Sequence, residues 1–540
     1  MWSGIFRRSS ALNIATVLRK LRAMAANANC SEAEARPESG SAQPPSGGVL
    51  PWLMPSLTQW LWLVIFLILI AQPWRTMMVA SDGDACMHWA VGDYMLQTGH
   101  IPIRADVFSH TRFGQPIVSK EWLSEIIFAM AGRRAGLFGL VVVAALLIAT
   151  TFALLHRQMA QETGNHAVAI FLALAAACAA CTHWMARPHA FTFLLAVLWA
   201  GELRRFERGG TPRRLAICLG LLTLLWVNLH GGYLAGFLTL GIYWLGAGIE
   251  LILVRTDPAR GNGARHKLKV LTGVIGLCAV VSLLNPNGYE LHVHNLGFLD
   301  SGFFTNWLAE YASSDFHAPD SRGFLAWLAL TFLTLAIVRP RLSPSSAILL
   351  VVWTYYALYS VRNIPLLVIF VGPILASALA EAAPLWVRRL SGRLREVDET
   401  SRGWPIVGAV ALAVVMSVPH PTEMIARKWP VAAVEFIKQH PEQFEGNMFN
   451  QYLWGGYLME ALPEHRVFVD GRTDFYGEPL LRQYDNTYLL HTNWQEALLQ
   501  YHVSWTLMPT QSRLNLVLAL LPNWHLAYSN DVATIFRKEP

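Results

Sequence analysis

Residues 81–122 have the sequence SDGDACMHWAVGDYMLQTGHIPIRADVFSHTRFGQPIVSKEW, a polar stretch that is rich in Asp and His. This stretch follows an apolar block at 55–72 that is long enough to be a membrane span. Ionisable groups are scarce beside a bilayer unless something is bound or made there. The two segments together predict a membrane protein whose function lies in a loop just outside the lipid.

The composition places the whole chain in the membrane class. Hydrophobic residues make up 54% of the 540 residues and charged residues only 14%, whereas a soluble domain carries roughly 25% charged residues. We therefore predict an α-helical polytopic membrane protein with a transmembrane domain at 54–418 and about eleven spans. The spans are expected at 55–72, 136–156, 166–182, 189–203, 214–229, 232–254, 268–284, 323–338, 345–360, 363–380 and 404–418.

The basic residues predict how the spans are oriented. Lys and Arg gather in every second short gap between the apolar blocks, and the other short gaps hold little beyond Arg187, Arg322 and Arg362. Short cytoplasmic loops carry the excess of Lys and Arg, so we expect the basic gaps in the cytoplasm of a plasma (inner) membrane protein. The tail at 1–53, predicted to be disordered, is then also cytoplasmic. The segments expected outside are the loops at 73–135 and 285–322 and the end of the chain at 419–540.

The net charge of +6 arises largely from the cytoplasmic loops. It favours membrane lipids as partners and requires no nucleic acid.

The last part of the chain, 419–540, changes character and lacks a long apolar block. Helix signals alternate there with short strand signals, which predicts a small extracytoplasmic α/β domain. The helix signals lie at 431–440 and 494–500, and the strand signals at 466–469, 503–507 and 533–536.

The first outer loop carries the candidate catalytic groups. Asp84 and His88 are four residues apart on a helix predicted at 84–96, with Gly99 placed to end it, so both side chains lie on one helix face. A carboxylate just outside the membrane can act as a general base on an acceptor hydroxyl or hold a divalent cation. Alternatively, these acids cap helices and pair with nearby Arg and Lys. The candidate catalytic residues are Asp82, Asp84, His88, Asp106 and Glu121, and Asp82 and Asp84 are the candidate cation ligands.

Other polar residues recur at the outer ends of the predicted spans. If the spans form a bundle, these ends converge near Asp84. An isolated arginine suits an anionic ligand such as a lipid phosphate, because its planar fork matches phosphate oxygens. Helix capping and anchoring at the membrane interface form the alternative. The candidate phosphate-binding residues are Arg187, His189, His230 and Arg362.

Two runs in the last domain, NQYLWGG at 450–456 and FVDGRTDFY at 468–476, concentrate aromatic and polar side chains. Exposed Trp and Tyr can stack on a sugar or a peptide. Alternatively, Asp470 orders a turn at a strand end and pairs with Arg472. The candidate acceptor-binding residues are Trp454, Tyr457, Asp470 and Arg472.

Taken in order, the motifs of the chain resemble membrane glycosyltransferases of the GT-C superfamily, and more closely an uncharacterised bacterial group within it. The resemblance spans most of residues 75–480. The matching residues of the first outer loop are Asp82, Asp84 and His88; Gly99, Ile101 and Pro102; Asp106, Phe108 and Ser109; and Glu121, Trp122 and Leu123. Further matches are ARPH at 186–189, WVNLHG at 226–231, Asn285, Pro286, Gly288, Arg362 and the two runs of the last domain.

The resemblance implies transfer of a sugar from a polyprenyl-phosphate donor to a glycan, lipid or protein acceptor on the outer face, with Asp84 as the catalytic carboxylate and Asp82 as the alternative. The phosphate is the leaving group, so attack from the opposite face of the sugar would invert the anomeric centre. One departure from the group is Cys86 and Met87, where relatives carry bulky aromatic residues.

Three other interpretations remain open. The first is an enzyme like the O-antigen ligases or the phosphoglycosyl transferases. The second is a purely structural or sensor role, with 419–540 as a binding module. The third is a transporter or flippase for a lipid-linked saccharide, although transporters tend to place ionisable residues near the bilayer midplane in matched halves. Here the ionisable residues collect in loops and at span ends.

Overall fold

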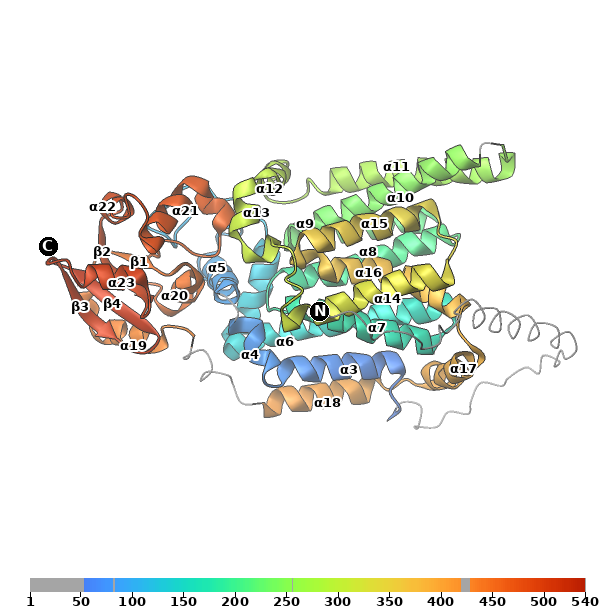
Figure 1. Ribbon diagram of the computed structural model, residues 1–540, viewed down its shortest axis with the longest axis horizontal. Coiled ribbons are helices and arrows are strands. Elements are labelled where there is room, and N and C mark those ends of the chain that lie inside the picture. Colours follow the sequence, from blue (N-terminus) through green and yellow to red (C-terminus); the bar gives the residue numbers. More distant parts are fainter. Residues whose placement is uncertain (1–52, 81–82, 255, 419–427, 540) are drawn as a thin grey trace, which may run out of the picture. The chain divides into compact units, whose positions relative to one another are not determined.

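The computed structural model describes residues 53–80, 83–254, 256–418 and 428–539. Asp82 and the tail predicted at 1–53, apart from its last residue, lie outside these ranges. The apolar helices run roughly parallel to one another (Figure 1). They are α3 (Leu57–Ile70), α6 (Trp122–Thr163), α7 (His166–Ala180), α8 (His189–Glu207), α9 (Pro212–Leu229), α10 (Tyr233–Leu253), α11 (Pro258–Val281), α14 (Arg322–Val338), α15 (Pro344–Tyr359), α16 (Ile364–Glu381) and α18 (Trp404–Ser417).

Each apolar block that was expected to span the membrane coincides with one of these helices. Within the described ranges, six helical segments are by themselves long and apolar enough to cross a membrane, and eight are if each of two bent helix pairs counts as one span. The chain is therefore a helical membrane protein, and the number and orientation of its spans stay predictions.

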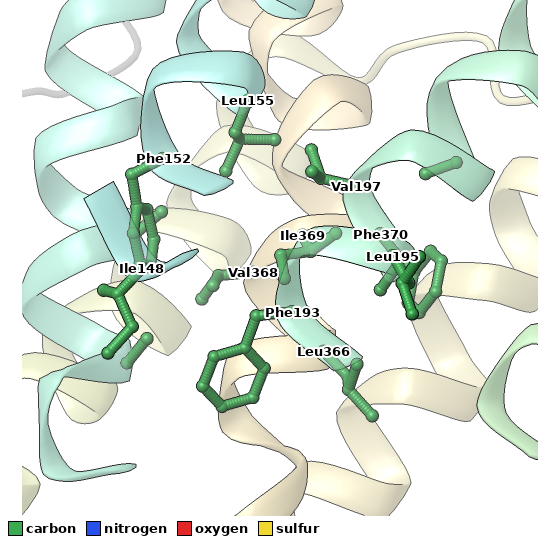
Figure 2. Close-up of a cluster of buried hydrophobic side chains, with 14 of the residues drawn as sticks. Ile148, Phe152, Leu155, Phe193, Leu195, Val197, Leu366, Val368, Ile369 and Phe370 are labelled. Atoms are coloured by element: carbon green, nitrogen blue, oxygen red, sulfur yellow. The ribbon is translucent and has the colours of Figure 1, made fainter. Parts of the chain in front are cut away.

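The core of the bundle lies where α6, α8 and α16 meet (Figure 2). In the apolar segment that includes α16, 78% of the residues are buried. In the segment that ends at Val338, only 28% are buried. The outer helices thus turn apolar side chains away from the protein, as expected where lipid surrounds a bundle. The core side chains drawn in Figure 2 include Ile148, Phe152, Leu155, Phe193, Leu195, Val197, Leu366, Val368, Ile369 and Phe370.

The first outer loop contains the helices α4 (Trp74–Ala80) and α5 (Asp84–Thr98) and the start of α6. The helix predicted at 84–96 is confirmed, and Gly99 ends it in the left-handed conformation. The backbone of α6 breaks at Ala135 and Gly136, and Gly136 has φ 57° and ψ −149°, which only glycine adopts readily. This break separates a loop helix from the apolar part of α6, close to the predicted span start at 136.

The second outer loop contains α12 (Glu290–Asp300) and α13 (Gly302–Trp307). On the opposite side of the bundle, α17 (Leu385–Thr400) precedes α18 and is bent from it by 82°.

A four-stranded sheet of order β1-β2-β4-β3 forms the end of the chain. Strand β1 (Asn447–Asn450) is parallel to β2 (Val503–Pro509), and β4 (Ala533–Lys538) is antiparallel to both β2 and β3 (Trp524–Ser529). The helices of this α/β part are α19 (Val431–Gln439), α20 (Gly455–Ala461), α21 (Thr473–Leu489), α22 (Glu496–Gln500) and α23 (Arg513–Leu518). The strand signals at 503–507 and 533–536 and the helix signals at 431–440 and 494–500 are confirmed.

The strand predicted at 466–469 is wrong. Val467 makes only an isolated bridge with Ser109 of the first outer loop. The backbone groups of Phe468 and Val469 bond instead to the side-chain amide of Asn450. The apolar run therefore fastens the outer loop to the last domain, and the short strands β1 and β3 were missed.

Candidate active site

Asp84 begins α5, where the helix dipole favours a carboxylate. Two glycines of the last domain allow its backbone to approach this helix end. A Cβ added to Gly471 would lie 2.1 Å from Asp84 Oδ1, and one added to Gly456 would lie 2.2 Å from the main-chain oxygen of Gly83. Gly456 and Gly471 are therefore explained by close packing against the start of α5.

One of the predicted phosphate-binding residues contacts Asp84, and a second contacts Glu310 beside it. Arg187 Nη1 lies 3.2 Å from Asp84 Oδ2 and 3.1 Å from Glu310 Oε2. Arg362 Nη1 lies 3.5 Å from Glu310 Oε1, and its guanidinium lies over the ring of Tyr311 at 4.4 Å. We refer to Asp84, Arg187, Glu310 and Arg362 as the outer charge cluster. Glu310, in the second outer loop, was not predicted as a site residue.

The carboxylates of the outer charge cluster are tuned in opposite directions. Burial, followed by the negative charge of Glu310, raises the pKa of Asp84 well above its ordinary value. Burial also raises the pKa of Glu310, but the positive charges of Arg362 and Arg187 outweigh it and lower that pKa to about 2. Glu310 is thus a fixed anion, whereas Asp84 can take up a proton closer to neutral pH.

His88 lies one turn beyond Asp84 and faces the start of α6. Its Nδ1 lies 3.3 Å from Glu125 Oε1, and its Nε2 lies 3.8 Å from Glu121 Oε2. The three residues offer ligand atoms within 4.8 Å of one another. Oε2 of Glu125 is buried, and no donor in the described part of the chain reaches it. Burial raises the pKa of Glu121, so the Glu121 carboxylate favours a bound proton or a nearby cation. An imidazole with two carboxylates is a suitable ligand set for a divalent metal.

The two remaining predicted histidines are turned toward protein groups. His189 Nε2 donates to the main-chain oxygen of His183 at 2.9 Å. His230 Nδ1 accepts from the main-chain N–H of Gly232 at 2.9 Å, and its Nε2 lies 3.4 Å from Glu121 Oε1. These contacts assign both rings to holding neighbouring groups in place, and phosphate binding by either ring stays a prediction.

A further ion pair near the site was not predicted. Lys120 Nζ and His294 Nε2 each lie 2.6 Å from Asp474 Oδ2, so the two outer loops and α21 meet at one carboxylate. Burial raises the pKa of Asp474, but the charges of Lys120 and His294 outweigh it and lower the pKa. Lys120 was considered only as a partner for acids, and no local pattern pointed to residues so far apart in the sequence.

Asp106 lies in a separate group with two predicted acceptor-binding residues. Arg472 donates to Asp106 Oδ1 at 2.7 Å and to Asp470 Oδ2 at 2.6 Å, and both carboxylates are fully buried. Ser109 Oγ donates to Asp106 Oδ2 at 2.6 Å. We refer to Asp106, Asp470 and Arg472 as the buried ion cluster. It contains the Asp470–Arg472 pair that was expected at this turn.

Trp454 and Tyr457 are buried, and Trp454 Nε1 donates to the main-chain oxygen of Lys428 at 3.2 Å. These two rings therefore do not form an exposed aromatic platform. Acceptor binding by residues of this domain stays a prediction.

No protein-family model and no curated protein sequence matches the chain. Solved structures do match it in fold. ArnT from Cupriavidus metallidurans bound to undecaprenyl phosphate is 15% identical, with a TM-score of 0.49 over 89% of this chain and 98% of ArnT. The oligosaccharyltransferase of Archaeoglobus fulgidus in its apo form is 13% identical, with a TM-score of 0.50 over 89% of this chain and 74% of the enzyme. The same enzyme tethered to an acceptor peptide gives 0.51 over the same shares.

The fold is thus similar to that of the Archaeoglobus fulgidus oligosaccharyltransferase. The fold suggested by the motifs of the first outer loop is thus confirmed. Within this fold, the outer charge cluster brings together the first outer loop, the second outer loop and the ends of two bundle helices. At such low sequence identity the likeness concerns the fold alone, and the roles of individual residues are argued from their geometry.

Proposed function

We propose that the chain is an integral-membrane glycosyltransferase that moves a sugar from a polyprenyl-phosphate donor to an acceptor on the outer face of the plasma membrane. The observation that carries the proposal is the outer charge cluster. It sets a carboxylate of raised pKa 3.2 Å from an arginine whose guanidinium can also meet a phosphate.

Asp84 acts as the general base in this proposal. The acceptor hydroxyl oxygen attacks the anomeric carbon, and its proton passes to the Asp84 carboxylate. The bond between the anomeric carbon and the phosphate oxygen breaks, and its electron pair leaves with the polyprenyl phosphate. Arg187 and Arg362 stabilise the phosphate charge, while Glu310 holds both guanidinium groups in place. Attack opposite the leaving group inverts the anomeric centre.

The proposal includes a divalent cation, but at a different place from the pair Asp82 and Asp84. His88, Glu121 and Glu125 provide a nitrogen and carboxylate oxygens at close range, and one oxygen of Glu125 lacks a donor among the described residues. A cation there would neutralise the two carboxylates and fix α5 against α6, and thereby the position of Asp84.

Transfer from labelled polyprenyl-phosphate sugars tests the proposed function. Membranes that contain the chain and membranes without it are given a panel of such donors. The expected result is release of polyprenyl phosphate together with a labelled product, in the first membranes only. Absence of product with every donor, accompanied by protein-dependent movement of a lipid-linked sugar across sealed vesicles, would replace the proposal with a flippase.

A further inference from the structure

Helix α17 (Leu385–Thr400) is anchored to the bundle through one side. Ser391 Oγ accepts from the main-chain N–H of His166 at 2.9 Å. Asp398 Oδ1 accepts from the main-chain N–H of Leu57 at 2.9 Å, and Asp398 Oδ2 lies 3.0 Å from His166 Nδ1. These contacts fix the rotation of the helix about its own axis, so its remaining faces are defined.

The helix cannot continue the direction of the bundle. It precedes α18 and is bent from it by 82°. Because α18 is an apolar helix that packs along α3, α17 lies across the end of the bundle, where the membrane surface would be (Figure 1). This end is opposite the outer charge cluster, since it holds the first residues of α3 and α7 and the last residues of α16.

An apolar stripe runs along a second face of α17. Trp386, Leu390 and Val397 are spaced by four and seven residues, so they lie on one side of the helix. All three are exposed, and Trp386 is 69% exposed. A helix in the plane of a membrane buries such a stripe at the boundary between headgroups and acyl chains.

Two arginines lie beside this stripe. Arg389 and Arg393 are four residues apart and exposed, and neither forms an ion pair with a carboxylate in the described part of the chain. The other arginines of the helix are engaged. Arg388 donates to the main-chain oxygens of Glu381 and Ala383, and Arg395 pairs with Glu399 at 2.6 Å. Two guanidinium groups one turn apart match the oxygens of a single phosphate.

We propose that α17 is an interfacial helix that binds an anionic phospholipid, with Arg389 and Arg393 on the headgroup phosphate and the stripe of Trp386, Leu390 and Val397 against the acyl chains. The charge of the free arginines selects an anionic headgroup over a zwitterionic one. This site serves a membrane lipid on the side away from Asp84 and does not depend on the proposed sugar transfer.

Lipid binding to the full chain in detergent tests the inference. Native mass spectrometry counts the lipids retained when phosphatidylglycerol or phosphatidylcholine of the same acyl chains is added. Wild type is expected to retain phosphatidylglycerol preferentially. The double variant Arg389→Gln/Arg393→Gln is expected to lose this preference by roughly ten-fold, and Arg395→Gln is the matched control that keeps it.

The variant Arg389→Lys/Arg393→Lys separates charge from folding, because it keeps both charges on exposed positions. It is expected to retain most of the preference. Equal retention of the two lipids by wild type would overturn the inference, and so would an unchanged preference in the Gln double variant that elutes as folded protein.

Discussion

Asp84 and Asp106 belong to the same outer loop and each contacts an arginine, but their surroundings differ. Asp106 is fully buried and accepts hydrogen bonds from Arg472, the Ser109 hydroxyl and the main-chain N–H of Ser109. The side chain of Asp84 is 24% exposed, and its arginine is shared with Glu310. The Asp106 carboxylate is fully hydrogen-bonded to protein donors, whereas the Asp84 carboxylate can still contact a substrate.

Within one loop, Asp106 therefore has the surroundings of a structural carboxylate and Asp84 those of a candidate general base. Asp106 also accepts from the main-chain N–H of Phe108, so four donors occupy its lone pairs and none is left for an acceptor hydroxyl. Losing the arginine partner of such a buried carboxylate is costly. A partly exposed carboxylate whose pKa is raised by burial holds a proton more readily than an ordinary aspartate, which favours a general base. Both acids lie in the same polar stretch of the sequence, so only their surroundings in the fold distinguish them.

Replacing Asp106 tests whether this acid stabilises the folded protein. Asp106→Asn removes one charge of the buried ion cluster and leaves Arg472 under-compensated, which is expected to cost about 3–5 kcal/mol of unfolding free energy. The midpoint of thermal unfolding, measured on the purified full chain, checks this. Asp84→Asn is the matched control and should shift the midpoint little, because Asp84 is partly exposed. Equal shifts for the two variants would remove the distinction.

Replacing Arg187 probes the proposed hold on the donor phosphate. Arg187→Gln is expected to raise the KM for the donor about 10- to 100-fold, the worth of a charge-assisted hydrogen bond. Arg187→Lys should recover only part of the affinity, because lysine lacks the planar fork. Steady-state kinetics against donor concentration measures the effect. Unchanged kcat and unchanged KM in Arg187→Gln would contradict the proposed contact with the phosphate.

Removal of the cation tests the group His88, Glu121 and Glu125. A chelator is expected to lower the rate of sugar transfer roughly ten-fold, the effect of losing groups that support a metal site. Added divalent metal should restore the rate. His88→Ala should lower the metal content of the purified protein, measured by elemental analysis. Full activity of purified protein that contains no divalent metal would leave the group as an ordinary hydrogen-bonded cluster.

The smallest expected effect is a shift in the pH dependence of sugar transfer when the neighbours of Asp84 are changed. Asp84 must be deprotonated to act as base, so activity should rise with pH through its raised pKa. Glu310→Gln removes a negative neighbour, lowers the pKa of Asp84 and shifts the acid limb of kcat/KM to lower pH. Arg187→Gln removes a positive neighbour and should shift it to higher pH. Shifts in the same direction for both variants would contradict the assignment.

Local patterns were enough to predict the helices and part of the site. Apolar blocks specify bundle helices because apolar side chains are stable both against lipid and in the protein core. The meeting of span ends brings Arg187 to Asp84 and Arg362 to Glu310. Glu310 and the contact between Lys120 and Asp474 could not be predicted, because each depends on loops brought together only by the tertiary fold.

The error at 466–469 has the same origin. The run RVFV has the composition of a strand, but the side chain of Asn450 binds the backbone at Phe468 and Val469, and the outer loop binds Val467. The composition of a segment indicates whether its backbone tends to be extended. Which residues it pairs with depends on the tertiary fold.

Sugar transfer by Asp84→Asn beside Asp106→Asn, both reconstituted in proteoliposomes and normalised to folded protein, tests the central claim most directly. The account predicts that Asp84→Asn loses about 10²- to 10⁴-fold in kcat, the usual contribution of a general base, with unchanged folding. Asp106→Asn should keep near wild-type activity per folded molecule. Full transfer by Asp84→Asn, or its loss only in proportion to folded protein, would contradict the claim.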